Sequence, residues 1–140
     1  MADAIRFHFD VDGENFSSAG EASVMVKKKL RQLGFSRDVM RRVSIAMYEG
    51  EINMVIHAHG GTADVIVNDG AIEIILADKG PGIPDISKAM QEGFSTASDN
   101  IRALGFGAGM GLPNMKKYTD YMQIDTEIGV GTTITMRVNY

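Results

Sequence analysis

The sequence contains no cysteine, so disulfide bonds and thiol chemistry are excluded. No stretch of it approaches the roughly 20 apolar residues that a membrane-spanning helix needs. The N-terminus, MADAIRFHFD, lacks the basic segment followed by an apolar run that marks a secreted protein. The sequence therefore carries no sign of export, and we expect a cytoplasmic protein.

Positive charge is also scarce. Lysine and arginine together number 14 against 18 aspartate and glutamate residues, which gives a formal net charge of -4. A protein that binds nucleic acid through bulk electrostatics needs a dense basic face. The nearest candidate is the basic run at 27–31, which is typical of the solvated side of a helix. We therefore expect no nucleic-acid partner.

What the sequence does contain fits one globular domain. The length of 140 residues is that of a single domain, and the contents of 44% hydrophobic and 23% charged residues are ordinary for a soluble protein. Glycine is distributed unevenly, because more than half of the 16 glycines lie between Gly80 and Gly131. Glycine used so locally serves backbone shape. We expect residues 1–140 to form one domain with a long functional loop in its second half.

The apolar pattern predicts most of the secondary structure. Alternation over residues 5–11 predicts an N-terminal strand. Spacings of three and four predict two amphipathic helices, from about 18 to 33 and from the N-cap Ser36 to about 58. The other predicted elements are strands at 64–68 and 71–78, a short helix at 86–91, a helix at 112–118, and strands at 121–127 and 132–138. Hairpin turns such as Asn68-Asp69-Gly70 imply antiparallel pairing. The predicted fold class is therefore α/β, a two-layer sandwich of a mixed, mainly antiparallel sheet with helices against it.

The first candidate site is on the second predicted helix. Glu49 and Asn53 are four residues apart, which places a carboxylate and an amide on the same helix face. They border the face expected to pack on the sheet, so they can act together on one ligand. Taken alone, the spacing is more typical of an exposed pair that adds little to helix stability.

The second candidate site follows a predicted strand. Asp78 ends that strand and is followed by Lys79-Gly80-Pro81-Gly82-Ile83. A carboxylate leaving a buried strand needs a hydrogen-bond donor. Two glycines one residue apart permit a tight turn and the close approach of a flat ligand. An ordinary turn between a strand and a loop has the same residues.

The third candidate site is a run of alternating glycines directly before a predicted helix, at Gly107, Gly109 and Gly111. Exposed backbone N–H groups and the positive end of a helix dipole form an anion site suited to phosphate. The run is neither a Walker loop nor a Rossmann fingerprint. A flexible hinge fits the same residues equally well.

In combination and in this order, the segments resemble the motif set of the GHKL family, which includes gyrase, MutL, histidine kinases and certain chaperones. The motifs are Glu49-x-x-x-Asn53, Asp78-x-Gly80-x-Gly82, Gly107-x-Gly109-x-Gly111 and Gly131-Thr132-Thr133. The resemblance implies the Bergerat ATP-binding fold, with helices on one face of the sheet. Segments 78–83, 93–96 and 111–117 are similar to free-standing switch kinases and anti-sigma factors. Residues 98–106 look longer than the lid of those proteins, which leaves the partner open.

The resemblance assigns part of the site to the adenine base of ATP. Asp78 would accept a hydrogen bond from the adenine amino group, and Thr132 would support the same ring edge through water. Further expected contacts with the nucleotide are Gly80, Gly82 and Ile83.

It assigns the rest of the site to the phosphates and to catalysis. Asn53 would bind Mg²⁺ through its side-chain oxygen, and Glu49 would orient and deprotonate the attacking hydroxyl. The expected phosphate loop consists of Gly107, Gly109, Met110, Gly111 and Leu112.

Three other polar side chains on the same helix receive no role. His57 and His59 are two residues apart and so lie on different helix faces, with no suitable third ligand nearby, and we do not expect zinc there. Glu51 is two residues from Glu49 and is expected to face solvent.

The function predicted from the resemblance is that of a serine/threonine kinase acting on a small regulatory protein, such as an anti-anti-sigma antagonist. One alternative is a nucleotide-gated protein that holds a sigma factor, and another is an ATPase subunit of a different complex. A homodimer is possible, with the edge of the first strand as a candidate interface.

Overall fold

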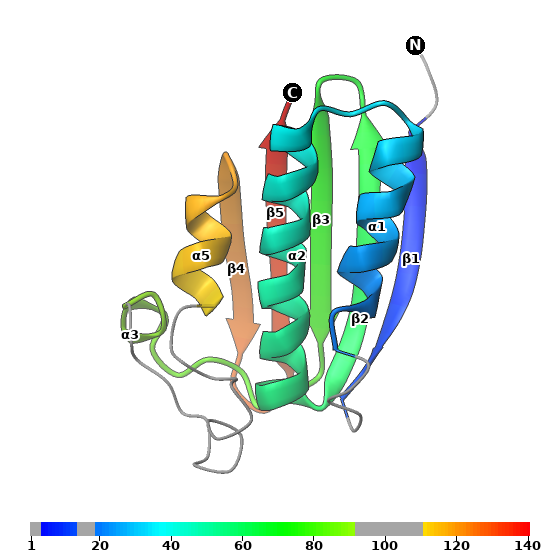
Figure 1. The fold of residues 1–140 in the computed structure, drawn as a ribbon. Helices are drawn as coiled ribbons and strands as arrows, with labels where there is room; N and C mark the ends of the chain where they lie inside the picture. The colour runs from blue at the N-terminus through cyan, green and yellow to red at the C-terminus, as the bar shows by residue number, and fades with distance from the viewer. Residues whose placement is uncertain (1–3, 14–18, 92–110) are drawn as a thin grey trace.

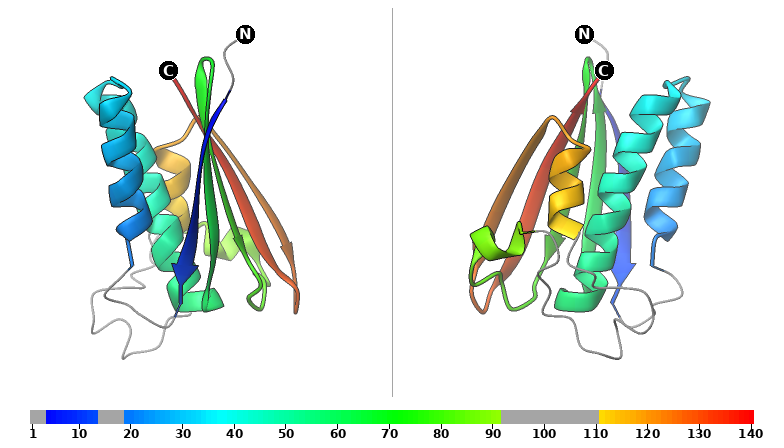
Figure 2. Two further views of the ribbon diagram at one scale, coloured as in Figure 1. Left: turned by 90° about the vertical axis from the view of Figure 1, so that its right-hand side faces the viewer. Right: turned by 60° about the vertical axis from the view of Figure 1, so that its left-hand side comes forward.

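The computed structural model describes residues 4–13, 19–91 and 111–140. In this part of the chain five strands form one sheet in the order β1-β2-β3-β5-β4, and every neighbouring pair is antiparallel. Helices α1, α2 and α5 lie on one face of this sheet (Figures 1 and 2). The predicted two-layer α/β sandwich is therefore confirmed. The elements are β1 Ile5–Asp12, α1 Glu21–Gln32, α2 Arg37–Ala58, β2 Gly60–Asn68, β3 Ala71–Asp78, α3 Ile86–Ala89, α5 Gly111–Lys117, β4 Tyr121–Glu127 and β5 Gly131–Asn139.

The largest difference from the predicted boundaries is at the start of β2. This strand begins at Gly60, four residues before the prediction, because Gly60 is paired with Asp12 of β1. Directly before it, His59 has a φ of 58°, and its N–H donates to the carbonyl of Met54 to end α2. The chain thus passes from helix to strand without a loop. The end of α2 is held beside the ends of the strands.

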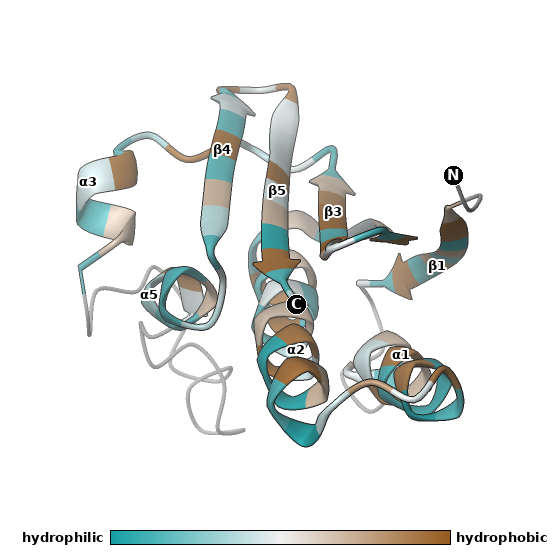
Figure 3. Cartoon of the chain, turned by 90° about the horizontal axis from the view of Figure 1, so that it is seen from above, coloured by the Kyte–Doolittle hydropathy of each residue, from teal (hydrophilic) through white to brown (hydrophobic). Residues whose placement is uncertain are grey.

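Helix α2 lies over the middle of the sheet, between α1 and α5 (Figure 3). It begins at the predicted N-cap, where Ser36 Oγ accepts a hydrogen bond from the N–H of Val39 at 3.2 Å. At Gly50 a Cβ atom would lie 2.0 Å from Leu76 Cδ1 of β3, so a larger residue here would require the Leu76 side chain to move. Although α2 has 22 residues, no described helix combines the length and the apolar character needed to cross a membrane.

The core lies between the sheet and these helices. Side chains alternate along a strand, so every second residue of β3 and β5 points toward the helices. The residues buried in this way are Ile72, Ile74, Leu76, Ile134, Met136 and Val138. The opposite face carries polar side chains, among them Arg6 of β1 and the pair Glu73 and Arg137, which are partners across β3 and β5. The sheet therefore has one buried and one solvated face.

The prediction that Glu51 faces solvent is wrong. Glu51 is only 2% exposed and reaches from α2 to the start of α1. Its carboxylate accepts hydrogen bonds from the backbone N–H groups of Gly20 at 3.0 Å, Ala22 at 3.3 Å and Ser23 at 2.7 Å. The first N–H groups of a helix have no partner within it, so Glu51 caps α1 from a neighbouring helix. Burial raises the pKa of Glu51, and the three N–H groups oppose that rise.

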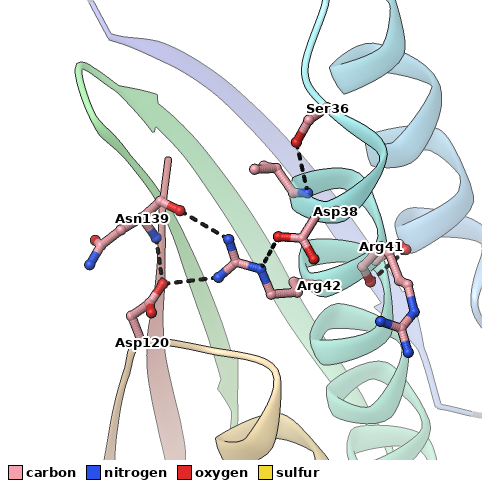
Figure 4. A network of polar contacts seen from close by, with 8 residues as sticks. Ser36, Asp38, Arg41, Arg42, Asp120 and Asn139 are labelled. Carbon is pink, nitrogen blue, oxygen red and sulfur yellow. Dashed lines mark hydrogen bonds and ion pairs between the residues drawn. The ribbon is translucent and has the colours of Figure 1, made fainter.

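A polar network ties the start of α2 to the C-terminal end of the chain (Figure 4). The Arg42 guanidinium donates to Asp38 at 3.0 Å, to Asp120 at 3.1 Å and to the backbone carbonyl of Asn139 at 3.1 Å. Asp120 also accepts from the N–H of Asn139 at 2.7 Å. This backbone bond, with Arg42 adding to it, lowers the pKa of Asp120.

Candidate functional site

Glu49 and Asn53 lie one turn apart on α2, and both are half-buried. Asn114 of α5 donates a hydrogen bond from Nδ2 to Glu49 Oε1 at 3.3 Å. A Cβ on Gly111, the first residue of α5, would lie 3.9 Å from Glu49 Oε2. The Glu49 carboxylate therefore faces the start of the helix that follows the glycine-rich loop. The side chain of Asn53 has no hydrogen bond to another described residue, so its amide oxygen is available to a ligand.

Asp78 is held at the end of β3 by two backbone groups. Its Oδ1 accepts from the N–H of Gly80 at 2.9 Å and from the N–H of Thr132 at 3.2 Å. Thr132 is the residue paired with Asp78 across β3 and β5. At the preceding Gly131, φ is 149° and a Cβ would lie 2.1 Å from the Asp78 carbonyl oxygen. Within the described residues Oδ2 receives no hydrogen bond, which leaves it as the acceptor for a ligand.

The glycines after Asp78 allow chain segments to approach one another. A Cβ on Gly80 would lie 2.6 Å from the Cβ of Ala58 at the end of α2. Gly82 has a φ of 84°, and its Cβ would lie 2.7 Å from the carbonyl oxygen of Glu127 at the end of β4. A side chain at either position would therefore collide with another part of the protein. These glycines bring the loop after β3 against both α2 and the β4–β5 turn, next to Asp78.

Ile83 and Thr132 are linked through Thr126 of β4, a residue that the sequence analysis missed. The N–H of Ile83 donates to Thr126 Oγ1 at 2.9 Å, and Thr126 Oγ1 lies 2.9 Å from Thr132 Oγ1. Thr126 and Thr132 are directly paired across β4 and β5. The sequence predicted the two strands of this hairpin but not their register. Only the register shows that residue 126 lies opposite residue 132.

The phosphate loop is described only where it joins α5. Gly111 is the first residue of this helix, and Leu112 is 6% exposed, with its side chain in the core. Outside the described residues lie Gly107, Gly109, Met110 and the predicted lid at 98–106. The contacts of this loop with phosphate remain predictions.

The two histidines near the end of α2 have separate surroundings. His57 is half-buried, and burial lowers its pKa. His59 is exposed and ends the helix. Over residues 4–13, 19–91 and 111–140, no three histidine or acidic side chains gather as metal ligands.

Residues 40–140 match the family of histidine kinase-, DNA gyrase B- and HSP90-like ATPases. The match begins in α2 and includes every candidate site residue. The chain belongs to this family, which confirms the predicted GHKL membership. Membership of an ATPase family implies that the chain binds ATP.

Among individual relatives, the chain is similar to an anti-sigma factor and to a serine/threonine-protein kinase. It is 28% identical to an anti-sigma F factor of Geobacillus stearothermophilus over 146 residues, which cover 100% of this chain and 94% of the relative. It is 34% identical to the serine/threonine-protein kinase RsbT of Bacillus subtilis over 108 residues, or 74% of this chain and 75% of that kinase.

A solved structure has the same fold. The crystal structure of the RsbU and RsbW domains of a Mycobacterium tuberculosis protein superimposes with a TM-score of 0.64 at 17% identity. The superposition covers 96% of this chain and 32% of that one, so the chain spans about a third of the larger protein.

The described residues fit a magnesium nucleotide. Asp78 is an acceptor paired with Thr132, where β3 ends and β5 begins. Glu49 and Asn53 supply a carboxylate and an amide oxygen on the neighbouring helix, and such oxygens are the ligands that Mg²⁺ prefers. Adenine recognition and metal binding are therefore both within the chemistry of these side chains.

Proposed function

We propose that the chain is a cytoplasmic, ATP-dependent serine/threonine protein kinase whose substrate is a small regulatory protein in a bacterial signalling switch. The observation that carries this proposal is the position of Glu49, whose carboxylate lies one helical turn from Asn53 and against the start of α5. The names of two relatives, an anti-sigma F factor and the serine/threonine-protein kinase RsbT, support the same function.

The nucleotide is held from both ends in this proposal. Asp78 accepts a hydrogen bond from the adenine amino group, and Thr132 supports the same ring edge through a water. Asn53 contributes its side-chain oxygen to Mg²⁺. The phosphates are held by backbone N–H groups of Gly107, Gly109 and Gly111. Bound ATP supplies the phosphoryl group that is transferred.

Glu49 acts on the acceptor. Its carboxylate orients the attacking hydroxyl of the partner's serine or threonine and removes the proton as the new O–P bond forms, while the bond from the γ-phosphorus to the bridging oxygen breaks and ADP leaves. The surroundings of Glu49 suit a base, because the Asn114 amide donates to one oxygen and leaves the other to accept a proton.

The proposal is tested by incubation with γ-labelled Mg·ATP and the small regulatory proteins and sigma factors encoded near the gene. Label on a regulatory protein supports a kinase. Free phosphate with no labelled protein supports an ATPase subunit instead. Nucleotide-dependent complex formation without label or phosphate release supports the second candidate, a nucleotide-gated anti-sigma binder, which the anti-sigma F factor relatives favour.

Two substitutions separate binding from chemistry. We expect Glu49→Gln to lower phosphoryl transfer by about 100-fold or more, the usual contribution of a general base, while ATP affinity stays within about threefold. Asp78→Asn presents an amide and should weaken ATP binding itself, by about tenfold or more. Calorimetry measures affinity and label transfer measures turnover. Full turnover in Glu49→Gln would remove Glu49 from the mechanism.

A further inference from the structure

Thr126 joins three separate segments beside the candidate base site. Its Oγ1 accepts a hydrogen bond from the N–H of Ile83 at 2.9 Å and lies 2.9 Å from Thr132 Oγ1. The carbonyl oxygen of Gly131 is a second, longer acceptor for the Thr126 hydroxyl, at 3.4 Å. Thr126 is half-buried and Thr132 is 6% exposed, so water competes little for these groups. The hydroxyl of Thr126 thus has defined partners.

The number of protons gives this network a direction. A threonine hydroxyl has one proton to donate and two lone pairs to accept with. The Ile83 N–H is only a donor, so Thr126 accepts there and has its own proton left to donate. Thr132 Oγ1 at 2.9 Å is a better acceptor position than the Gly131 carbonyl at 3.4 Å. The shorter contact favours donation from Thr126 to Thr132, and in that orientation the Thr132 proton is left for a ligand.

Thr132 then presents a donor next to an acceptor. Thr132 is paired with Asp78 across β3 and β5, and its backbone N–H donates to Asp78 Oδ1 at 3.2 Å, which leaves Asp78 Oδ2 to accept. The edge of adenine carries an amino donor at N6 and a ring acceptor at N1. Guanine carries the reverse pair, an acceptor at O6 and a donor at N1. The arrangement matches adenine and opposes guanine, and such matching discriminates strongly in a buried site.

We propose that Thr126 is a positioning residue for nucleotide selection, which fixes the Thr132 hydroxyl as a donor to adenine N1, directly or through one water. This inference rests on the proposed ATP site but not on kinase activity. Thr126 itself contacts no base. It acts through the orientation of one proton on its neighbour.

The test combines a change in the ligand with a change in the protein. Calorimetry gives the Kd of ATP and of 1-deaza-ATP, in which N1 is replaced by a C–H group. The wild-type protein should bind ATP about tenfold more tightly than 1-deaza-ATP, as loss of one hydrogen bond predicts. Thr126→Val removes the hydroxyl at nearly constant shape. It should raise the Kd of ATP about five- to tenfold and leave the Kd of 1-deaza-ATP within about twofold of the wild-type value.

Two further variants serve as controls. Thr126→Ser keeps the hydroxyl and should retain the preference for ATP over 1-deaza-ATP. Thr132→Val removes the donor directly but keeps the backbone N–H that Asp78 accepts, so it should lose the same preference. This variant tests the inference even if Thr126→Val does not fold, which far-UV circular dichroism would reveal.

Other outcomes overturn the inference at different levels. Equal weakening of both ligands by Thr126→Val would mean that Thr126 only supports the loop at Ile83. Equal binding of both ligands by the wild-type protein would mean that Thr132 donates no hydrogen bond to adenine N1. The proposed ATP site would still stand. Binding of neither ligand would overturn the proposed function together with this inference.

Discussion

Asn114 holds Glu49 through one hydrogen bond, from Nδ2 to Oε1 at 3.3 Å. The bond comes from α5, so the orientation of the proposed base depends on a residue outside its own helix. We expect Asn114→Leu to lower kcat about tenfold, because the carboxylate loses its only described hydrogen-bond donor, while KM for ATP changes less than about twofold. Steady-state kinetics of partner phosphorylation measure both constants.

The control for this prediction uses the same substitution in a second background. If Asn114 acts through Glu49, the substitution should cost little further activity in a Glu49→Gln protein, since residues that act as a unit are not additive. Lys116→Gln, at an exposed position on the same helix, should leave kcat unchanged. An equal tenfold loss in both backgrounds would show that Asn114 acts on something other than Glu49.

Residue spacing predicted some of these positions and could not predict others. Glu49 and Asn53 follow from the helical repeat, and the structure does bring them to one side of α2. Thr126 and Asn114 depend instead on strand register and on the packing of α5 against α2. Neither quantity is encoded in local spacing, so both residues became visible only in the folded chain.

Among the elements, α2 shows most clearly what a periodic pattern misses. The pattern predicted its start at Ser36 and its end near residue 58 correctly, because caps and glycines are local signals. It also assumed one buried face. In the fold α2 packs on the sheet and has α1 and α5 on either side, so residues well away from the sheet are buried as well (Figure 3). Glu51 is one of these.

The cap that Glu51 places on α1 should be important for stability. Glu51→Gln keeps the shape but offers one oxygen and one N–H₂ group to three backbone N–H donors. At least one buried donor loses its acceptor, and we expect a loss of about 1–3 kcal/mol in the free energy of unfolding. Urea unfolding at neutral pH measures it. Glu127→Gln, at an exposed carboxylate, is the matched control and should change stability little.

The same pair of proteins gives the pH dependence of the cap. Because burial raises the pKa of Glu51, the folded state holds the proton more tightly than the unfolded state does. Stability from this group is therefore fully present below the ordinary pKa of 4.5 and is lost as the pH rises through the raised value. The advantage of the wild-type protein over Glu51→Gln should shrink as the pH rises from 4 toward neutrality. An advantage that grows over this range would mean that the three N–H groups outweigh burial.

On the scale of the whole molecule, the two ends of the sandwich have different tasks. At one end Arg42 binds Asp120, which is 78 positions later in the sequence, and the carbonyl of Asn139, which is 97 positions later. These bonds tie the start of α2 to the end of β5. At the other end the candidate site is assembled from the later turns of α2, the end of β3 and the start of β5 (Figure 1). The site exists only when these elements are in place, so nucleotide binding and folding must be linked.

This linkage predicts a large stabilisation by nucleotide. A ligand that binds only the folded state adds about 2.7 kcal/mol at 100 times its Kd, which for a domain of this size raises Tm by roughly 10 °C. We expect Mg·ATP and Mg·ADP each to produce such a shift in differential scanning calorimetry, because Asp78 and Thr132 recognise the base that both share. Asp78→Asn should reduce the shift at the same nucleotide concentration without changing Tm by more than a few degrees in its absence. If the wild-type protein, folded and in saturating Mg·ATP, melts at the same temperature as without nucleotide, then the residues around Asp78 and Asn53 do not form an ATP site.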